Sequence, residues 1–206
     1  MHPLPKPLRA FARPIPLALA LALCTAIPVV AGAVLALQIP LGAVPDSSQR
    51  LLVAPVAIFL HALAGALFGL LGPLQFTRAL RGRFGALHRA AGYAFVTAGV
   101  LLGASGLSLL ARVSASPLLD TARALAGAAL IAALILGLTT RRHRAWMIRA
   151  YALGMGSGVV GLVYLPIYVI TGAPPQGLAA DLIMVATWAL ALLVAETVVR
   201  SLNDPR

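Results

Sequence analysis

The sequence predicts an all-α, multi-pass membrane protein with six spanning helices in a single membrane domain over residues 1–206. Hydrophobic residues make up 61% of the chain and charged residues only 10%, against roughly 45–50% and 25% in a soluble domain. The apolar residues lie in long runs that lack the alternation of a membrane β-barrel. A soluble fold could not cover so much apolar surface with so few charges, so the chain is expected in a bilayer.

Six apolar runs approach or exceed the roughly 20 residues that a spanning helix requires. The expected spans are, in order, 15–37, 52–77, 88–111, 120–140, 146–170 and 180–200. Prolines separate several of them: Pro40 and Pro45 follow the first span, Pro117 precedes the fourth, and Pro174 and Pro175 follow the fifth. The middle four spans are expected to form the core bundle, because three of them carry histidine and glycine faces. The first span is expected at the periphery.

The first span also resembles a cleavable signal peptide. Lys6 and Arg13 bound a basic stretch before it, and Ala31-Gly32-Ala33 offers a cleavage site. The apolar run continues beyond that site through residues 34–37, which favours a retained span. Cleavage would leave five spans, and this alternative stays open.

Thirteen of the 16 cationic residues fall on one side of the predicted topology. They are Lys6, Arg9, Arg13, Arg78, Arg81, Arg83, Arg89, Arg141, Arg142, Arg144, Arg149, Arg200 and Arg206. Only Arg50, Arg112 and Arg123 fall on the other side. This bias predicts a bacterial inner-membrane protein with both termini in the cytoplasm. Because topology accounts for the net charge of +11, nucleic acid is not an expected partner, whereas anionic lipid headgroups are.

Three histidines are candidate site residues. His88 begins the third span, and His143 precedes the fifth. Each of these two histidines is followed by glycines 11, 15 and 18 residues later. These glycines are Gly99, Gly103 and Gly106 in one span and Gly154, Gly158 and Gly161 in the other. His61 lies inside the second span, where an ionisable side chain is costly and often functional. The glycines indicate close helix packing or, alternatively, a slot for a flat ring such as haem or a quinone.

Other polar residues are expected in structural roles. Trp146 is expected to anchor a helix at the headgroup level. Glu196 and Arg200 are spaced for an ion pair within one helix. Gln75 follows Pro73 and could hydrogen-bond a carbonyl that the proline leaves free. No serine, histidine and acid are placed for hydrolysis, so the sequence leaves enzymatic activity undecided.

Three segments of the chain resemble a family of predicted bacterial multi-pass membrane proteins, catalogued as a domain of unknown function. They are LHALAGALFGLLGPLQF, LHRAAGY and HRAWMIRAYAL, followed by a tryptophan and VAE in the last span, and together they cover about residues 55–199. The resemblance implies no activity. It implies a set of marked positions, which are His61, Gln75, His88, Arg89, His143, Arg144, Trp146, Met147 and Arg149.

A looser resemblance is to four-helix haem-b membrane proteins of the cytochrome b and ferric reductase kind. It implies that His88 and His143 ligate one haem iron. Arg89 and Arg144 would then pair with the propionates, and Met147 would contact the ring. The fourth span contains no histidine to face His61, so at most one such haem is expected.

Three functions therefore remain open. The first is an integral membrane protein of unknown activity whose basic loops contact anionic lipid or a membrane partner. The second is a haem-b or quinone-linked electron carrier that uses His88 and His143, or His61. The third is a small transporter with a site at mid-membrane, which the lack of an acidic ion site in the spans disfavours.

Overall fold

The computed structural model describes residues 17–45 and 52–203, and all regular structure in these ranges is helical. The long helices are α2 (Leu17–Gln38), α3 (Pro55–Gln75), α5 (Gly85–Leu110), α6 (Pro117–Thr139) and α9 (Gly177–Asn203). The shorter elements are α4 (Arg78–Arg83), α7 (His143–Gly156), the 3₁₀ turn η2 (Gly158–Val160) and α8 (Gly161–Thr171). Within the described chain, five helices are long and apolar enough to cross a membrane, and α7 with α8 makes a sixth, bent candidate. The predicted all-α membrane fold is confirmed.

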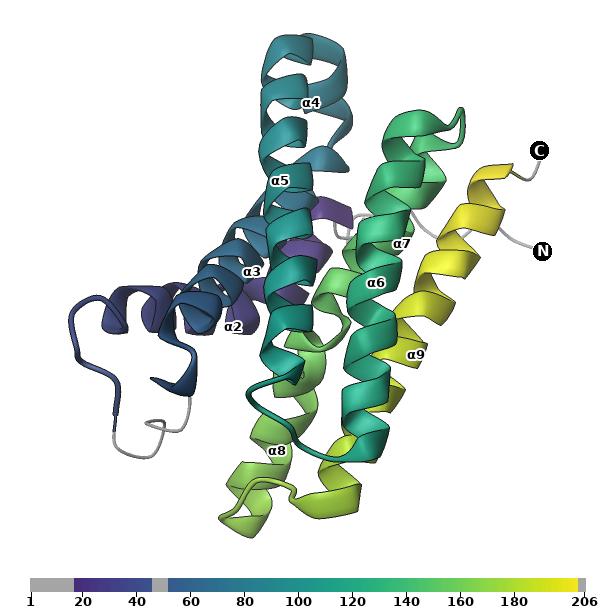
Figure 1. Cartoon of the computed structure of the whole chain (residues 1–206). Coiled ribbons are helices and arrows are strands. Elements are labelled where there is room, and N and C mark those ends of the chain that lie inside the picture. Colours follow the sequence, from purple (N-terminus) through teal and green to yellow (C-terminus); the bar gives the residue numbers. More distant parts are fainter. Residues whose placement is uncertain (1–16, 46–51, 204–206) are drawn as a thin grey trace, which may run out of the picture.

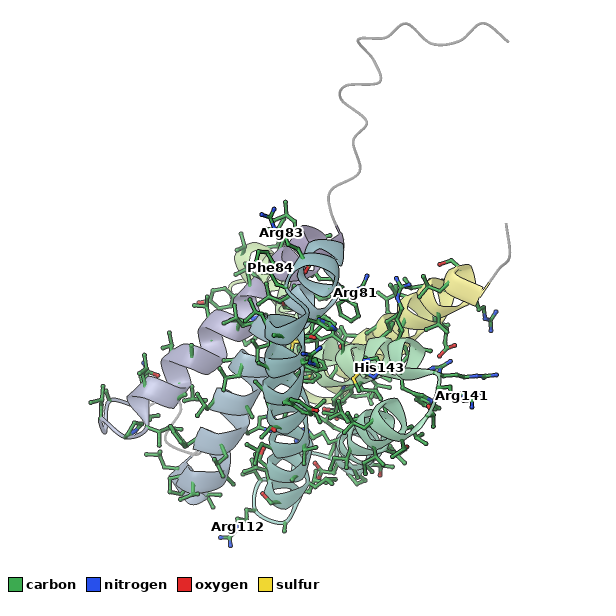
Figure 2. The ribbon with its side chains drawn as sticks, turned by 90° about the horizontal axis from the view of Figure 1, so that it is seen from above. Arg81, Arg83, Phe84, Arg112, Arg141 and His143 are labelled. Carbon is green, nitrogen blue, oxygen red and sulfur yellow. The ribbon has the colours of Figure 1, made fainter. Side chains whose placement is uncertain are left out.

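Helices α5, α6, α7 and α9 run alongside one another, and α2 and α3 are inclined to them (Figure 1). Helix α2 packs along α3. At the top of this view, α4 and the first turns of α5 and α7 lie beside the last turns of α6 and α9. We call this the basic end, defined by Arg81, Arg83, Arg89, Arg141, Arg142 and Arg144. Figure 2 looks onto the basic end.

The fifth expected span, 146–170, is not one continuous helix. Helix α7 ends at Gly156, α8 begins at Gly161, and the two helices are bent by 49°. Gly154, Gly156, Gly158 and Gly161 fall in eight consecutive residues, and glycine is the residue that least favours a continuous helix. The expected fifth span is therefore a bent pair of helices. Hydropathy alone could not reveal the bend, because both halves are apolar.

The core lies where α3, α5, α6 and α7 meet, as the sequence predicts. Phe68, Phe95 and Leu134 are its largest fully buried side chains. The rings of Phe68 and Phe95 stack with their centroids 4.3 Å apart, and the Tyr151 ring lies 5.8 Å from that of Phe68. Apolar side chains on the outer faces of the helices, such as Leu190, remain exposed. This distribution suits lipid as the surrounding solvent.

The glycines that follow His88 and His143 are packing positions. A Cβ atom on Gly99 would lie 2.7 Å from Cε2 of Phe68, and one on Gly154 would overlap the same ring. The remaining four glycines face Ile131 (Gly103), His61 (Gly106), Pro28 (Gly158) and Ile27 (Gly161). Side chains of neighbouring helices therefore occupy these positions, which supports close packing as the reason for the glycine faces.

Candidate functional site

A cavity of about 420 Å³ lies at the basic end, bordered by α3, α5, α6 and α7. Six residues singled out by the sequence line it, and they come from three segments far apart in the chain. They are Gln75, His88, Arg89, His143, Arg144 and Met147. The structure thus brings together the two histidines that were expected to share a site. We call this space the basic-end cavity.

His143 is held in one tautomer by the end of the preceding helix. Its Nδ1 lies 2.8 Å from the carbonyl oxygen of Gly137. A carbonyl can only accept, so Nδ1 carries the proton and donates it to this bond. The bond satisfies one of the carbonyls that the end of α6 leaves without an intrahelical partner. Nε2 of the ring is then left with a lone pair that can accept a hydrogen bond or bind a metal.

Gly137 also makes room for Met147, which lines the cavity. A side chain at this glycine would overlap the terminal methyl group of Met147. Met147 is buried and packs into the same core cluster as Phe95 and Tyr151. One glycine of α6 therefore positions both the His143 ring and the Met147 thioether on α7.

Two polar atoms at the cavity have no hydrogen-bond partner. They are Nδ1 of His88, in the first turn of α5, and Nε2 of Gln75, in the last turn of α3. Both atoms are buried, and a buried polar atom left without a partner costs roughly 1–3 kcal/mol. A ligand that reaches both of them would remove that cost.

The expected bond from Gln75 to a freed carbonyl is not formed. Pro73 has no N–H, so the carbonyl of Gly69, four residues earlier, loses its helical donor. The hydroxyl of Tyr151 donates to this carbonyl instead, at 3.2 Å. Tyr151 thus fills the role that the sequence gave to Gln75 and leaves the Gln75 amide at the cavity.

The basic-end cavity has a cationic lining. Arg81, Arg89 and Arg144 line it, and no carboxylate is found among the described residues of its lining. The nearest acid along α9, Glu196, is engaged by Arg149, with Nε–Oε1 and Nη2–Oε2 distances of 2.5 and 3.0 Å. The arrangement can accept an anion, and its aromatic and aliphatic walls can accept an apolar group beside that anion.

The partner of Glu196 differs from the sequence prediction. Its two-pronged ion pair runs from α9 to Arg149 on α7, 47 residues away in the chain. An ion pair with Arg200 is not among those that the described residues form. The guanidinium of Arg149 also lies over the Trp146 ring, 4.8 Å from its centroid. Trp146 was expected only as a headgroup anchor, and it also takes part in this contact between α7 and α9.

His61 is not part of the basic-end cavity. It borders a second cavity nearer the opposite end of the bundle, where its Nδ1 lies 3.2 Å from the hydroxyl oxygen of Ser105. The His61 ring lies against Gly106 of α5. It does not join His88 and His143 in one site.

The sequence did not single out the other seven lining residues as site residues, among them Arg81, Tyr93 and Phe76. Arg81 had been counted only as a topology signal. Tyr93 lies four residues after Arg89, which puts both on one face of α5. That spacing could have identified Tyr93, but nothing in the sequence marked Phe76.

A family model described as "Predicted membrane protein (DUF2306)" matches residues 58–199 of the chain. This agrees with the resemblance carried by the three histidine-containing segments. No curated protein and no solved structure matches the chain. The matched range includes every residue that lines the basic-end cavity.

Proposed function

Since this chain belongs to the DUF2306 family of predicted membrane proteins, whose molecular activity is unknown, we propose that its basic-end cavity binds the anionic head of a membrane lipid. The single observation that carries the proposal is the composition of the cavity lining. Three arginines, two histidines and Gln75 converge there, with no carboxylate among the described lining residues.

The charge of the lining favours an anion over a neutral ligand. Cations gathered in one cavity lining repel one another. An anionic oxygen between Arg89 and Arg144 would offset this repulsion and accept charge-assisted hydrogen bonds. The same ligand could accept a bond from Nε2 of Gln75, which has no partner of its own.

The apolar walls favour an amphiphile over a small inorganic anion. Phe76, Val96, Leu138 and Met147 line the cavity beside the cationic groups. A phosphate ion would leave these side chains without a ligand contact, whereas a lipid could place its glycerol and upper acyl carbons against them. The position at the ends of apolar helices matches the depth of a phospholipid headgroup.

The direction of the chain in the membrane follows from the same arginines. Loops rich in lysine and arginine remain on the cytoplasmic side of the bacterial inner membrane. We therefore expect the basic-end cavity to face the cytoplasmic leaflet, with both chain termini on that side. An anionic lipid of this leaflet is the expected ligand.

Lipid binding in detergent tests the proposal. Native mass spectrometry of the full chain would count bound short-chain phosphatidylglycerol and, in a parallel titration, phosphatidylcholine. The double variant Arg89→Gln/Arg144→Gln is expected to weaken phosphatidylglycerol binding by at least about tenfold, since the loss of even one charge-assisted hydrogen bond costs roughly 1.5–3 kcal/mol.

A matched control removes the same charge from the same end. Arg141 and Arg142 are exposed in the turn between α6 and α7 and do not line the cavity. The variant Arg141→Gln/Arg142→Gln should keep binding within about twofold of the parent. Equal weakening in both double variants would mean that the whole basic surface attracts lipid, and would refute a cavity site.

Haem b is a second candidate for the same cavity. It is favoured by the bond from Nδ1 of His143 to Gly137, because a haem-ligating histidine commonly donates its other N–H to a carbonyl. His88 would supply the second ligand, and Arg89 and Arg144 would hold the propionates. Haem would bring one-electron transfer to the site.

A reduced-minus-oxidised absorption spectrum tests the haem candidate. The protein would be purified from cells supplied with a haem precursor. A haem-b α-band that disappears in His88→Ala and in His143→Ala would establish haem at this site. A colourless protein would remove the haem candidate and leave the lipid proposal standing.

A further inference from the structure

The second cavity has a volume of about 320 Å³ and shares no lining residue with the basic-end cavity. It is bordered by α3, α5, α6, α7 and α9, and it extends toward the turn between α5 and α6. Its polar lining side chains are His61, Arg123, Ser157 and the indole of Trp188. We call it the His61 cavity.

The hydrogen bonds around His61 fix which ring nitrogen carries the proton. The Ser105 hydroxyl donates to the Leu101 carbonyl at 2.6 Å, and its single proton is thereby used. The Ser105 oxygen can then only accept from Nδ1 of His61, which lies 3.2 Å away. Nδ1 is therefore the donor, and Nε2 of His61 is left with a lone pair. A ligand with a hydroxyl or N–H group could donate to this lone pair.

The charge of the His61 cavity differs from that of the basic-end cavity. Arg123 is its one charged residue among those described, and its guanidinium lies 3.4 Å from the carboxylate of Asp120. The Trp188 N–H already donates to the Leu153 carbonyl at 3.0 Å, so the indole offers a ligand an apolar surface. An uncharged ligand with a hydrogen-bond donor fits this environment.

The size of the cavity limits its ligand. Gly103 on α5 and Gly127 on α6 lie so close that a Cβ on Gly103 would be 3.1 Å from the Gly127 oxygen, so these two helices meet directly beside the cavity. The volume is at the small end of the range for ligand pockets, which is roughly 300–1,000 Å³. It suits a single aromatic head ring.

We propose that the His61 cavity binds the head ring of a hydroxylated aromatic amphiphile, the class to which membrane quinols belong. One ring hydroxyl donates to Nε2 of His61, and the ring lies against the indole of Trp188. The oxidised quinone has carbonyls in place of hydroxyls and cannot donate to Nε2. The cavity therefore binds the reduced form more tightly than the oxidised form.

Tryptophan fluorescence provides the measurement. The chain has two tryptophans, so Trp146→Phe leaves Trp188, in the cavity wall, as the sole reporter. The full chain in detergent would be titrated with duroquinol under reducing, anaerobic conditions and separately with duroquinone. Saturable quenching is expected, with a Kd about 3- to 10-fold lower for the quinol, which corresponds to one net hydrogen bond.

Three further variants test the role of His61. His61→Ala should bring the two Kd values within about twofold of each other. Ser105→Ala, which frees the ring to change tautomer, should reduce the preference while leaving helix packing nearly intact. Gly82→Ala lies outside both cavities and should leave both Kd values unchanged.

Two results would overturn the proposal. One is quenching that rises linearly with either compound and never saturates, which indicates collisions in the detergent. The other is a preference for the quinol that persists in both His61→Ala and Ser105→Ala. Neither result bears on lipid binding at the basic-end cavity, because the two cavities share no residue.

Discussion

Individual hydrogen bonds divide the three described histidines into two kinds. Nδ1 of His61 donates to the hydroxyl oxygen of Ser105, and Nδ1 of His143 donates to the carbonyl oxygen of Gly137. Each is thereby held in one tautomer with Nε2 as the acceptor. His88 has a buried Nδ1 without a partner. The first two rings are prepared by the protein alone, whereas the third gains a partner only with a ligand.

The ion pair between Arg149 and Glu196 gives a residue-scale prediction. A double-mutant cycle with Arg149→Ala and Glu196→Ala should give a coupling free energy of about 1 kcal/mol, because the two-pronged pair is partly exposed. Unfolding by SDS in mixed micelles would supply the four free energies of unfolding.

The same cycle on Glu196 and Arg200 serves as the comparison. Those two residues form no ion pair among the described residues, so their coupling should be smaller than that of Arg149 with Glu196. A larger coupling for Arg200 than for Arg149 would contradict the packing of α9 against α7.

At the scale of helices, close approach through glycine determines the packing. Gly72 on α3 faces the Tyr151 ring of α7, and Gly69, one turn earlier, faces Val29 of α2 and Met155 of α7. The Tyr151 hydroxyl also donates to the Gly69 carbonyl. The glycine face of α3 therefore holds α2 and α7 together.

Replacing Gly72 by alanine should destabilise the protein. The new methyl group would overlap the Tyr151 ring, and such overpacking costs roughly 1–3 kcal/mol. Gly82 on α4 is a matched control, since a Cβ there meets nothing within 4 Å. Gly82→Ala should change the thermal unfolding midpoint little. Equal effects of the two substitutions would contradict the close contact between α3 and α7.

Hydropathy predicted where the helices lie along the sequence, but it did not predict how the helices contact one another. Long apolar runs bounded by proline predicted five spans closely, since a spanning helix must be apolar throughout. The bend between α7 and α8 was missed because both halves satisfy the same condition.

The site residues were also predicted only in part. His88 and His143 were singled out by the glycines that follow them, and Arg89, Arg144 and Met147 by the family resemblances; all five line one cavity. The pairing of Glu196 with a residue 47 positions away depends on how α9 packs, which no local pattern records. The hydroxyl of Tyr151 was missed for the same reason.

At the scale of the whole molecule, the two cavities differ in charge as the two ends of the bundle do. The basic-end cavity is lined by three arginines, and the His61 cavity by one arginine that has an acidic neighbour. An asymmetric distribution of arginine both orients a membrane protein and attracts anionic lipid to one side. The same arginines at the basic end are therefore expected to orient the chain in the membrane and to bind the lipid.

Reporter fusions test the orientation. A green fluorescent protein fused after the last residue should fluoresce, and an alkaline phosphatase fused there should be inactive, because that end is expected in the cytoplasm. A phosphatase fused in the turn between α5 and α6, near Arg112, should be active. The opposite pattern of activities would place the basic end outside and remove the cytoplasmic lipid as its ligand.

Photocrosslinking tests the central claim, a lipid-binding cavity at the basic end, most directly. Phosphatidylglycerol with a photoreactive group beside the phosphate would be added to the purified chain, and labelled peptides would be mapped by mass spectrometry. Labels are expected within residues 75–96 and 138–147, which contain the cavity lining, and excess phosphatidylglycerol but not phosphatidylcholine should displace them. Labels spread along the outer faces of α2 and α9, with no preference for the anionic competitor, would contradict the claim.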